Sequence, residues 1–194
     1  MNFYVLQNYL ESTGTQYIGL PLIANVNSTL SFEGEMIPRY KNGVSTNWYV
    51  FNTNPQNQLS GHFYSKNATT NKILYASYSG NNAQSGGWGS GTEVDVKGNF
   101  IISTEGRTSY STGQYSTLHR PLTQNVNMFY LFGNYTGNRC PIAYGKLFIK
   151  VDNIAIYELI PVRVGQVGYM YDKVSNQLFG NSGTGNFILG NDMN

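Results

Sequence analysis

The sequence predicts an all-β fold, an antiparallel β-sandwich or barrel, and two observations indicate it. Apolar and polar residues alternate with a period of two in several short runs, whereas helical periodicity is nearly absent. Asn, Gly and Pro cluster between these runs about every ten residues, which is typical of tight turns that join short strands. At 194 residues the chain can form a single domain, residues 1–194, with a sizeable core.

Seven runs alternate strongly enough to predict strands. In chain order they are residues 29–37 (TLSFEGEMI), 47–53 (NWYVFNT), 60–65 (SGHFYS), 72–79 (KILYASYS), 93–103 (EVDVKGNFIIS), 127–135 (NMFYLFGNY) and 145–162 (GKLFIKVDNIAIYELIPV). The segments between them, such as KNG, TNPQNQ, TEGR and YTGNRCP, are rich in residues that favour turns. The last run is long and contains Asp152 and Asn153, so we expect two strands joined by a turn at this pair.

Charge is scarce in this chain. Charged residues make up 11% of the sequence, the net charge is +2, and the 12 basic residues are scattered. Nucleic acids and anionic membranes require clustered Lys and Arg, so we expect neither as a partner. Amides and hydroxyls are abundant instead, with 24 Asn and 16 Tyr beside 22 Gly. Such a surface suits sugars, and it equally suits a soluble β-protein with many Asn and Gly turns.

The start of the sequence and the single cysteine limit the cellular locations and the covalent cross-links that we expect. The start, MNFYVLQNYLESTG, lacks the basic and apolar regions of a secretory signal, and no apolar run approaches the roughly 20 residues that span a bilayer. We expect a chain that stays in the cytoplasm or leaves its cell by another route, such as lysis. Cys140 is the only cysteine, which excludes an internal disulfide, and we expect it to be a small buried residue.

The stretch GNSGTG, residues 180–185, has the glycine density of a phosphate-binding loop. It lacks the Lys-Ser/Thr pair of a Walker loop, and the strand-like NFILG follows it where a helix would be needed. We therefore interpret it as a glycine-dependent turn before a last strand at residues 186–189.

Two terminal segments carry a family resemblance. YLESTGTQYIGLPL (residues 9–22) and YELIPVRVGQVGYMYDKVSNQLFGNSGTGNFILG (residues 157–190) resemble the opening and closing runs of lectin-like domains found in phage structural proteins and bacterial surface proteins. The resemblance implies a concanavalin A-like jelly-roll sandwich, of the kind shared by lectins, laminin-G-like modules and some glucanases. It also implies that the first and last strands lie side by side, with STGTQYI and SGTGNFI closing one edge of a sheet.

The resemblance further implies a setting and a role. We expect a phage structural protein on the virion surface, such as a capsid decoration or tail-fibre protein, that contacts host glycans or other virion proteins. The two signatures lie almost at the chain ends, so we expect the domain with nothing attached, which disfavours a tail-fibre tip. The alternatives are a bacterial carbohydrate-binding protein, extracellular or on the cell surface, and a glucanase-like hydrolase. A homo-oligomer is left open.

The enzymatic alternative is disfavoured by one position. Retaining glycosidases need two carboxyl groups about 5–5.5 Å apart, and glucanases of the implied fold use the run E-x-D-x-x-E. Here Glu93 and Asp95 match the first two acids, but Gly98 stands where the final Glu is needed. Because one of the two catalytic groups is missing, we expect no enzyme, and we interpret Glu93 and Asp95 as the solvent-facing side of a strand.

Neither a metal site nor a cofactor is predicted. His62 and His119 have no Cys, His or acidic neighbour at ligand spacing. A calcium site built from Asp, Asn and carbonyl oxygens needs no tight motif and is left open. Asp152 and Asn153 are candidates for it, although a turn between strands explains them better.

Glycan binding needs aromatic rings that stack on sugars and polar groups that bind hydroxyls. The candidate contacts are Trp48, Trp88, Arg107, Tyr110, Tyr115 and Tyr135. Aromatic residues of β-sandwiches usually fill the core, and Trp48, within NWYVF, is the candidate for which this alternative is strongest. Trp88 lies among glycines, and Tyr110 and Tyr115 lie in the polar run RTSYSTGQYST, which favours exposure.

Overall fold

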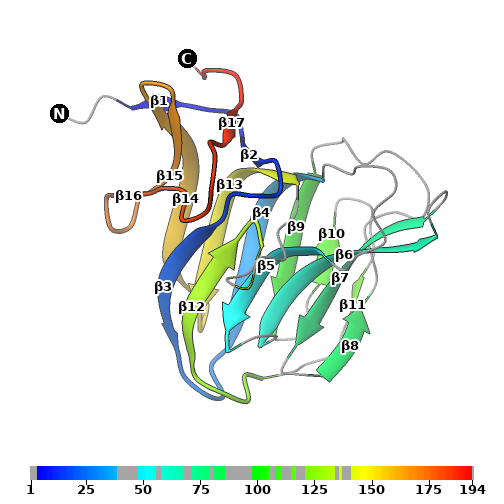
Figure 1. Ribbon diagram of the computed structural model, residues 1–194. Coiled ribbons are helices and arrows are strands. Elements are labelled where there is room, and N and C mark those ends of the chain that lie inside the picture. Colours follow the sequence, from blue (N-terminus) through cyan, green and yellow to red (C-terminus); the bar gives the residue numbers. More distant parts are fainter. Residues whose placement is uncertain are drawn as a thin grey trace.

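A computed structural model describes the greater part of the chain (Figure 1). The described residues are 4–38, 48–55, 58–67, 71–78, 81–85, 98–104, 108–110, 115–116, 121–133, 136 and 141–193. For residues 38, 48, 62–67, 71–78, 81–85, 108–110 and 115–116 the description covers only the backbone. Within these ranges all regular structure is β-strand and all strand pairing is antiparallel, so the all-β prediction is confirmed.

The smaller sheet has six strands. In spatial order they are β3 (Ile18–Ala24), β12 (Val126–Leu131), β5 (Trp48–Asn54), β6 (Leu59–Asn67), β7 (Asn71–Tyr78) and β8 (Asn81–Ser85). The edge strand β3 carries Pro21 at its centre, where a missing N–H is tolerated because that edge of the strand needs no ladder hydrogen bond.

The larger sheet has eleven strands. Its main path runs β11 (Tyr115–Ser116), β10 (Thr108–Tyr110), β9 (Gly98–Ser103), β4 (Leu30–Pro38), β13 (Ile142–Val151), β14 (Ile154–Val164), β15 (Val167–Asp172) and β16 (Gln177–Phe179). Three short strands from the two ends of the chain join this path: β1 (Val5–Leu6), β2 (Leu10–Ser12) and β17 (Ile188–Leu189).

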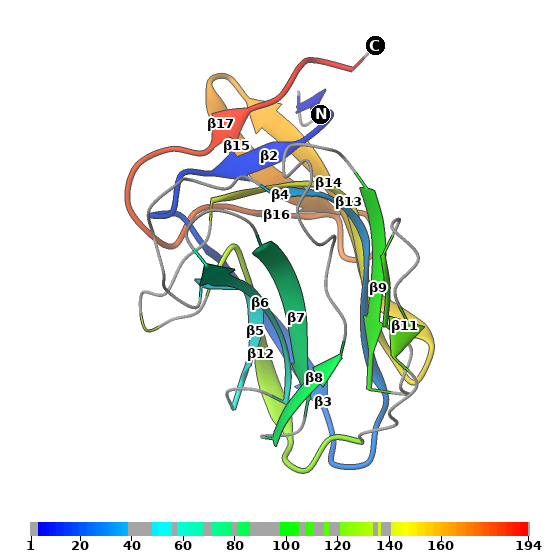
Figure 2. The ribbon, with the colours of Figure 1, turned by 90° about the vertical axis from the view of Figure 1, so that its right-hand side faces the viewer.

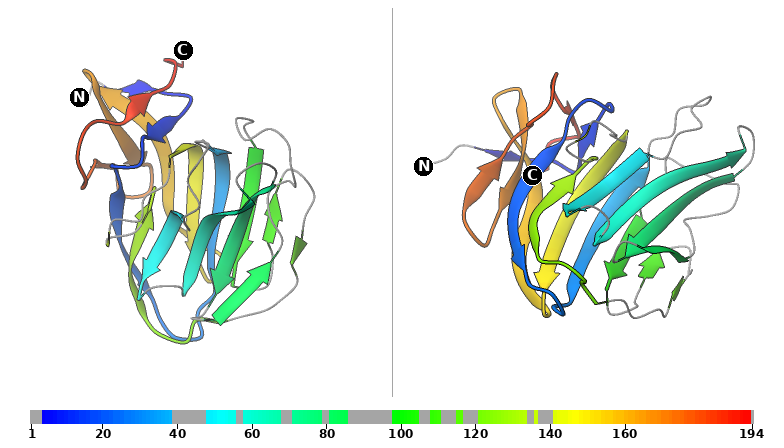
Figure 3. Two further views of the ribbon diagram at one scale, coloured as in Figure 1. Left: turned by 45° about the vertical axis from the view of Figure 1, so that its right-hand side comes forward. Right: turned by 60° about the horizontal axis from the view of Figure 1, so that its bottom comes forward.

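The two sheets lie face to face in a β-sandwich-like arrangement (Figures 2 and 3). Side chains from both sheets meet in one core, in which Phe32 of β4 is the central aromatic residue. Its ring lies 4.6 Å from that of Phe51, 4.8 Å from that of Phe100 and 5.0 Å from that of Phe129, measured between centroids. Such tilted and edge-to-face packing joins strands of both sheets and adds to the free energy gained by apolar burial.

Each of the seven expected runs contains a strand, and two strands outside them, β3 and β15, were missed for the same reason. Strands β4, β5, β6, β7, β9, β12, β13 and β14 occupy the seven expected runs, although residues 93–97 lie outside the described residues. The alternation of β3 escaped notice because its outward positions are Gly19, Pro21 and Ile23 rather than polar residues. In β15 the outward positions are Tyr169 and Tyr171, which hide the pattern in the same way.

The turn at Asp152 and Asn153 is confirmed. It joins β13 to β14, and both residues have positive φ, 50° and 64°, as a type I′ hairpin turn requires. The Asp152 carboxylate accepts hydrogen bonds from the Thr29 N–H, at 2.8 Å, and from the Ser28 hydroxyl, at 3.1 Å. These contacts give the carboxylate a structural role and fasten the turn to the start of β4.

The two ends of the chain are also paired, as the resemblance implied. Strand β17 pairs with β2, with Ile188 opposite Glu11, and both lie at one end of the molecule (Figure 1). Residues 12–17 and 181–186 dock on each other through backbone bonds from Ser182 to Tyr17, 2.8 Å, and from Thr184 to Thr15, 3.2 Å. We call these two loops the terminal clasp.

The glycine-rich stretch therefore forms a docking turn, and its interpretation as a turn is confirmed. Gly185 has φ +73°, which favours glycine, and a Cβ at Gly183 would collide with the Thr15 carbonyl oxygen. Asn181 closes the loop, because its amide accepts from the Gly183 N–H at 2.7 Å and donates to the Gly185 carbonyl at 2.8 Å.

Candidate functional site

The larger sheet forks beside the terminal clasp, and the fork creates a pocket. One half of β13 pairs with β14, through Leu147 to Val151, whereas residues 142–144 pair with β2 instead. Beyond the point of separation, β14 takes β1 as its neighbour on this side and keeps β15 on the other. A pocket of about 270 Å³ lies at this fork, lined by Leu6, Gln7, Asn8, Glu35, Lys146, Ile160, Pro161 and Met193. We call it the fork pocket.

A β-bulge places the charged residues of the fork pocket. Tyr144 pairs with Met36 and Leu147 pairs with Gly34, so Gly145 and Lys146 together oppose the single residue Glu35. A side chain at position 145 would collide with the Glu35 carboxylate. Glycine at this position therefore lets Glu35 lie across the bulge, next to Lys146.

The bulge also depends on Gly34. Its φ is +145°, and a Cβ there would collide with the Lys146 carbonyl oxygen. Met36 and Leu147 point into the core, so the alternation of the strands turns Glu35 and Lys146 to the outer face of the sheet. Two glycines thus present a carboxylate and an ammonium group side by side on that face.

The remaining walls are largely apolar. Ile160 of β14 lies on the face opposite to the core residue Leu159, and Pro161 follows it. Leu6 and Met193, which are 37% and 51% exposed, come from the two ends of the chain. Their backbones are joined by a hydrogen bond of 2.9 Å from the Met193 N–H to the Leu6 carbonyl. The pocket therefore combines aliphatic walls with a polar side.

Ion pairs balance the charges next to the pocket. The Lys146 ammonium lies 2.8 Å from the Glu158 carboxylate, and the Lys173 ammonium lies 2.7 Å from the same oxygen. These two hydrogen-bonded lysines lower the pKa of Glu158 from its ordinary value. The Lys146 ammonium also lies 4.6 Å from the centre of the Phe148 ring, a cation–π distance. Lys146 is thus held over the outer face by Glu158 and Phe148, and the residue also lines the pocket.

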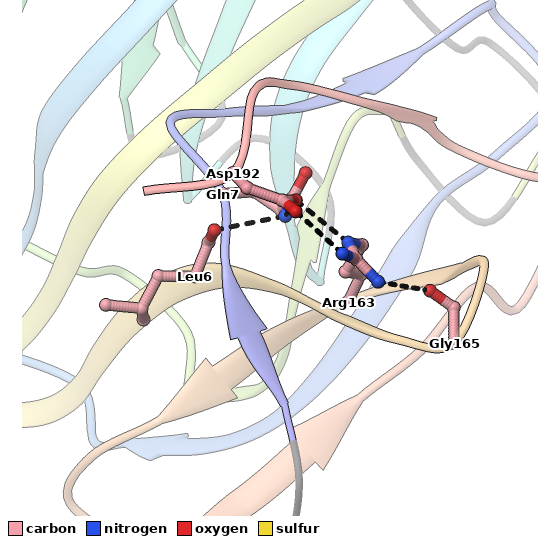
Figure 4. Close-up of polar contacts among 5 residues, drawn as sticks. All are labelled: Leu6, Gln7, Arg163, Gly165 and Asp192. Atoms are coloured by element: carbon pink, nitrogen blue, oxygen red, sulfur yellow. Dashed lines mark hydrogen bonds and ion pairs between the residues drawn. The ribbon is translucent and has the colours of Figure 1, made fainter. Parts of the chain in front are cut away.

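A second polar network secures the chain ends behind the pocket (Figure 4). Arg163 donates two hydrogen bonds to the Asp192 carboxylate, at 2.8 and 2.6 Å, and Gln7 donates a third at 2.6 Å. Arg163 and Gln7 lower the pKa of Asp192 well below its usual range, because each stabilises the ionised carboxylate. The Gln7 N–H donates to the Pro161 carbonyl at 2.9 Å, which keeps the residues after β1 against β14.

The six predicted glycan contacts do not form one cluster in the described residues. Tyr110 and Tyr115 lie in β10 and β11, neighbouring strands at one edge of the larger sheet, with Ser109 opposite Tyr115. Trp48 begins β5 in the other sheet, opposite Phe63 of β6. Trp88, Arg107 and Tyr135 lie outside the described residues. The structure thus brings Tyr110 and Tyr115 near each other, and the roles of all six stay predictions.

The described residues that line the fork pocket include none of these six, and sequence reasoning missed this pocket. Its residues come from five separate parts of the chain, so no local motif contains them. The signal that could have found it is the pair Gly34 and Gly145, because an isolated glycine within a strand pattern indicates a bulge or a close backbone approach.

Several residues named in the catalytic and metal-site hypotheses lie outside the described residues. Gly98 is the buried first residue of β9, while Glu93, Asp95, His119 and Cys140 lie outside the described residues. Among the residues that are described, no three His, Cys, Asp or Glu side chains gather as a metal site would require. The same residues include no helix with the length and hydropathy needed to cross a membrane.

Comparison with known proteins adds no relative. No protein-family model matches the chain, and no curated protein matches its sequence.

Proposed function

We propose that this protein is a non-catalytic surface protein of a phage particle, built on a concanavalin A-like jelly roll. It makes non-covalent contacts with host glycans or with other virion proteins. The observation that carries the proposal is the terminal clasp, because its two loops are the segments on which the family resemblance rests. Gln16 donates to the carbonyls of Thr184 and Asn186, at 3.2 and 3.0 Å, so the two signatures act as one structural unit.

Two further features support a binding role. The chain is rich in amides and hydroxyls and poor in charge, which suits recognition of neutral, hydroxyl-bearing ligands. Tyr110 and Tyr115 lie on the two outermost strands of a sheet edge, one on each face, because Tyr115 is paired with Ser109 rather than with Tyr110. The expected site is the edge formed by β9, β10 and β11, at the opposite side of the larger sheet from β15 and β16.

The proposal is tested first by binding. We expect saturable binding on a glycan array, and we expect either Tyr110→Ala or Tyr115→Ala, the one whose face of the sheet carries the contact, to weaken it about two- to tenfold, as the loss of one stacked ring would. Ile23→Ala is the control, because Ile23 is 82% exposed on β3 of the other sheet. Equal losses in all three variants would contradict the placement of the contact at β10 and β11.

The particle association is tested separately. The protein is expected to sediment with phage particles through a density gradient and to be cross-linked there to other virion proteins. A chain that is recovered only as a free soluble monomer, and that binds no glycan, would overturn the proposed function.

A further inference from the structure

We propose that the fork pocket is a subsite for the acetamido group of a neutral N-acetylated sugar. This inference rests on the proposed function, because it specifies which glycans the protein distinguishes. An acetamido group has a methyl group, one N–H donor and one carbonyl acceptor in a compact unit. The fork pocket has aliphatic walls, a carboxylate and an ammonium group, which are the three complementary features.

The aliphatic walls accommodate the methyl group. Leu6, Ile160 and Met193 enclose the apolar part of the pocket, and Pro161 adds a rigid ring to it. Leu6 and Met193 keep 37% and 51% of their surfaces exposed. A methyl group that enters this space covers apolar surface which otherwise faces water, and this burial is favourable. A hydroxyl group in the same position would leave its hydrogen-bonding capacity unused against these walls.

The polar side accommodates the amide. The β-bulge holds Glu35 beside Lys146, and both line the pocket. The carboxylate of Glu35 can accept from the ligand N–H, and the ammonium group of Lys146 can donate to the ligand carbonyl. The glycines at positions 34 and 145 are required for this arrangement, since a Cβ at either would collide with the Lys146 carbonyl or the Glu35 carboxylate. The chain therefore keeps two strand-weakening residues where they place these groups.

The charge balance selects a neutral ligand. Lys146 and Lys173 face Glu158, and Glu35 adds a second carboxylate to the same part of the outer face. Among the described residues at this place, two positive groups thus stand beside two negative ones, an arrangement that does not favour an ionic ligand. A sialic acid or a sulfated sugar would place an unbalanced anion against Glu35 and Glu158, so neutral acetamido sugars are favoured over acidic ones.

The size of the pocket limits what enters it. At about 270 Å³ it is slightly smaller than the roughly 300–1,000 Å³ of pockets that enclose a drug-sized molecule. It can take a substituent together with part of one sugar ring, and the rest of the glycan then lies along the outer face of the sheet. The predicted affinity is therefore modest, and the subsite acts on selectivity between sugars.

The experiment compares sugars that differ only in this substituent. The full chain, labelled with ¹⁵N, is titrated with methyl N-acetyl-β-glucosaminide and methyl β-glucoside, and with the corresponding galactose pair, and amide shifts are followed by NMR. We expect the acetamido member of at least one pair to bind about fourfold or more tightly, the factor that burial of one methyl group supplies. The amide signals of Leu6, Ile160 and Met193 should move with it.

Two variants test the pocket itself. Ile160→Phe narrows the pocket, and Lys146→Met retains an aliphatic chain but removes the donor. Both should remove the preference for the acetamido sugar while binding of the hydroxyl sugar is unchanged. Ile154→Phe is the matched control, because Ile154 is 66% exposed at the far end of the same strand. Unchanged amide spectra away from the pocket identify the variants as folded.

The outcomes separate the inference from the function on which it rests. Equal binding of both members of every pair, or a preference that both pocket variants retain, would overturn the acetamido subsite and leave glycan binding standing. The absence of sugar binding in the titration and on the array, together with cross-linking of the fork pocket to a virion protein, would overturn the subsite in favour of a protein contact. Loss of the preference in both variants but not in Ile154→Phe would support it.

Discussion

The terminal clasp and the fork pocket are neighbours, yet they are built in opposite ways. The clasp consists of two short loops, residues 12–17 and 181–186, whose polar groups are extensively hydrogen-bonded to each other. The pocket is assembled from five separate parts of the chain and has mostly aliphatic walls. A recognisable motif therefore marks the part of the molecule that closes the fold, whereas the surface suited to a ligand carries no motif of its own.

Gln16 shows most clearly how the hydrogen-bonded clasp differs from the mostly aliphatic pocket. It is 2% exposed, and its Oε1 accepts from the Thr13 N–H at 2.8 Å while its Nε2 donates to two carbonyls of the opposite loop. An amide is the side chain that can do both, because it has an acceptor and two donors. The clasp thus requires particular residues, in contrast to an aliphatic wall that tolerates exchange among apolar residues.

The largest predicted effect comes from Gln16→Glu. This change keeps the size of the side chain but turns a buried carboxylate towards the carbonyls of Thr184 and Asn186. We expect a loss of about 3–5 kcal/mol in the free energy of unfolding near neutral pH, the usual cost of an uncompensated buried charge. Urea unfolding measures it, with the exposed Gln166 as the control position: Gln166→Glu should stay within about 0.5 kcal/mol of the wild type.

A result near zero for Gln16→Glu would contradict the clasp as a stabilising unit. The same measurement on Ile160→Ser, at the pocket wall, sharpens the comparison. Ile160 is only half-buried on the outer face, so its replacement should affect stability less than that of Gln16. If Ile160→Ser were the more damaging variant, the pocket rather than the clasp would be the structural element.

The sequence predicts the strands and the turns of the terminal clasp better than it predicts the fork pocket, and the reason is physical. Alternating side chains predict a strand wherever outward positions are polar, which located β4 and the β13–β14 hairpin. The positive φ angles at Asp152 and Asn153 follow from local turn chemistry, and so does the turn at Gly185. The fork pocket depends instead on which strands pair and where the ladder slips by one residue, and such long-range register has no local signature.

A smaller effect is predicted for Gly183→Ala. The new Cβ would collide with the Thr15 carbonyl oxygen, so the loop must move away from residues 12–17. We expect a loss of about 1–3 kcal/mol in the free energy of unfolding, as for other overpacked positions. Gly165→Ala is the matched control, since Gly165 has φ +59° but no atom within 4 Å of an added Cβ. It should cost only about 1 kcal/mol, from the backbone conformation alone. Equal costs in the two variants would show that close approach of the loops contributes nothing.

The smallest effect is predicted for the ion pair between Arg163 and Asp192, and this effect depends on pH. Folding lowers the pKa of Asp192, chiefly through Arg163 and then through Gln7, so the ionised carboxylate adds stability above its ordinary pKa of about 3.9. This contribution decreases progressively as the pH falls from that value towards the lower pKa of the folded state, where the native carboxylate becomes protonated.

Thermal unfolding of the wild type and of Asp192→Asn should therefore differ between pH 5 and pH 8 and converge at lower pH, with the wild type more stable in the upper range. Glu158, whose pKa is also lowered, is present in both proteins and cancels in the difference. The side chain of Asp192 is 49% exposed, so added salt should reduce the difference. A difference that is unchanged at pH 3 would contradict the ion pair as its cause. It would instead assign the role of Asp192 to contacts that do not titrate, such as the packing of the last residues beside the fork pocket.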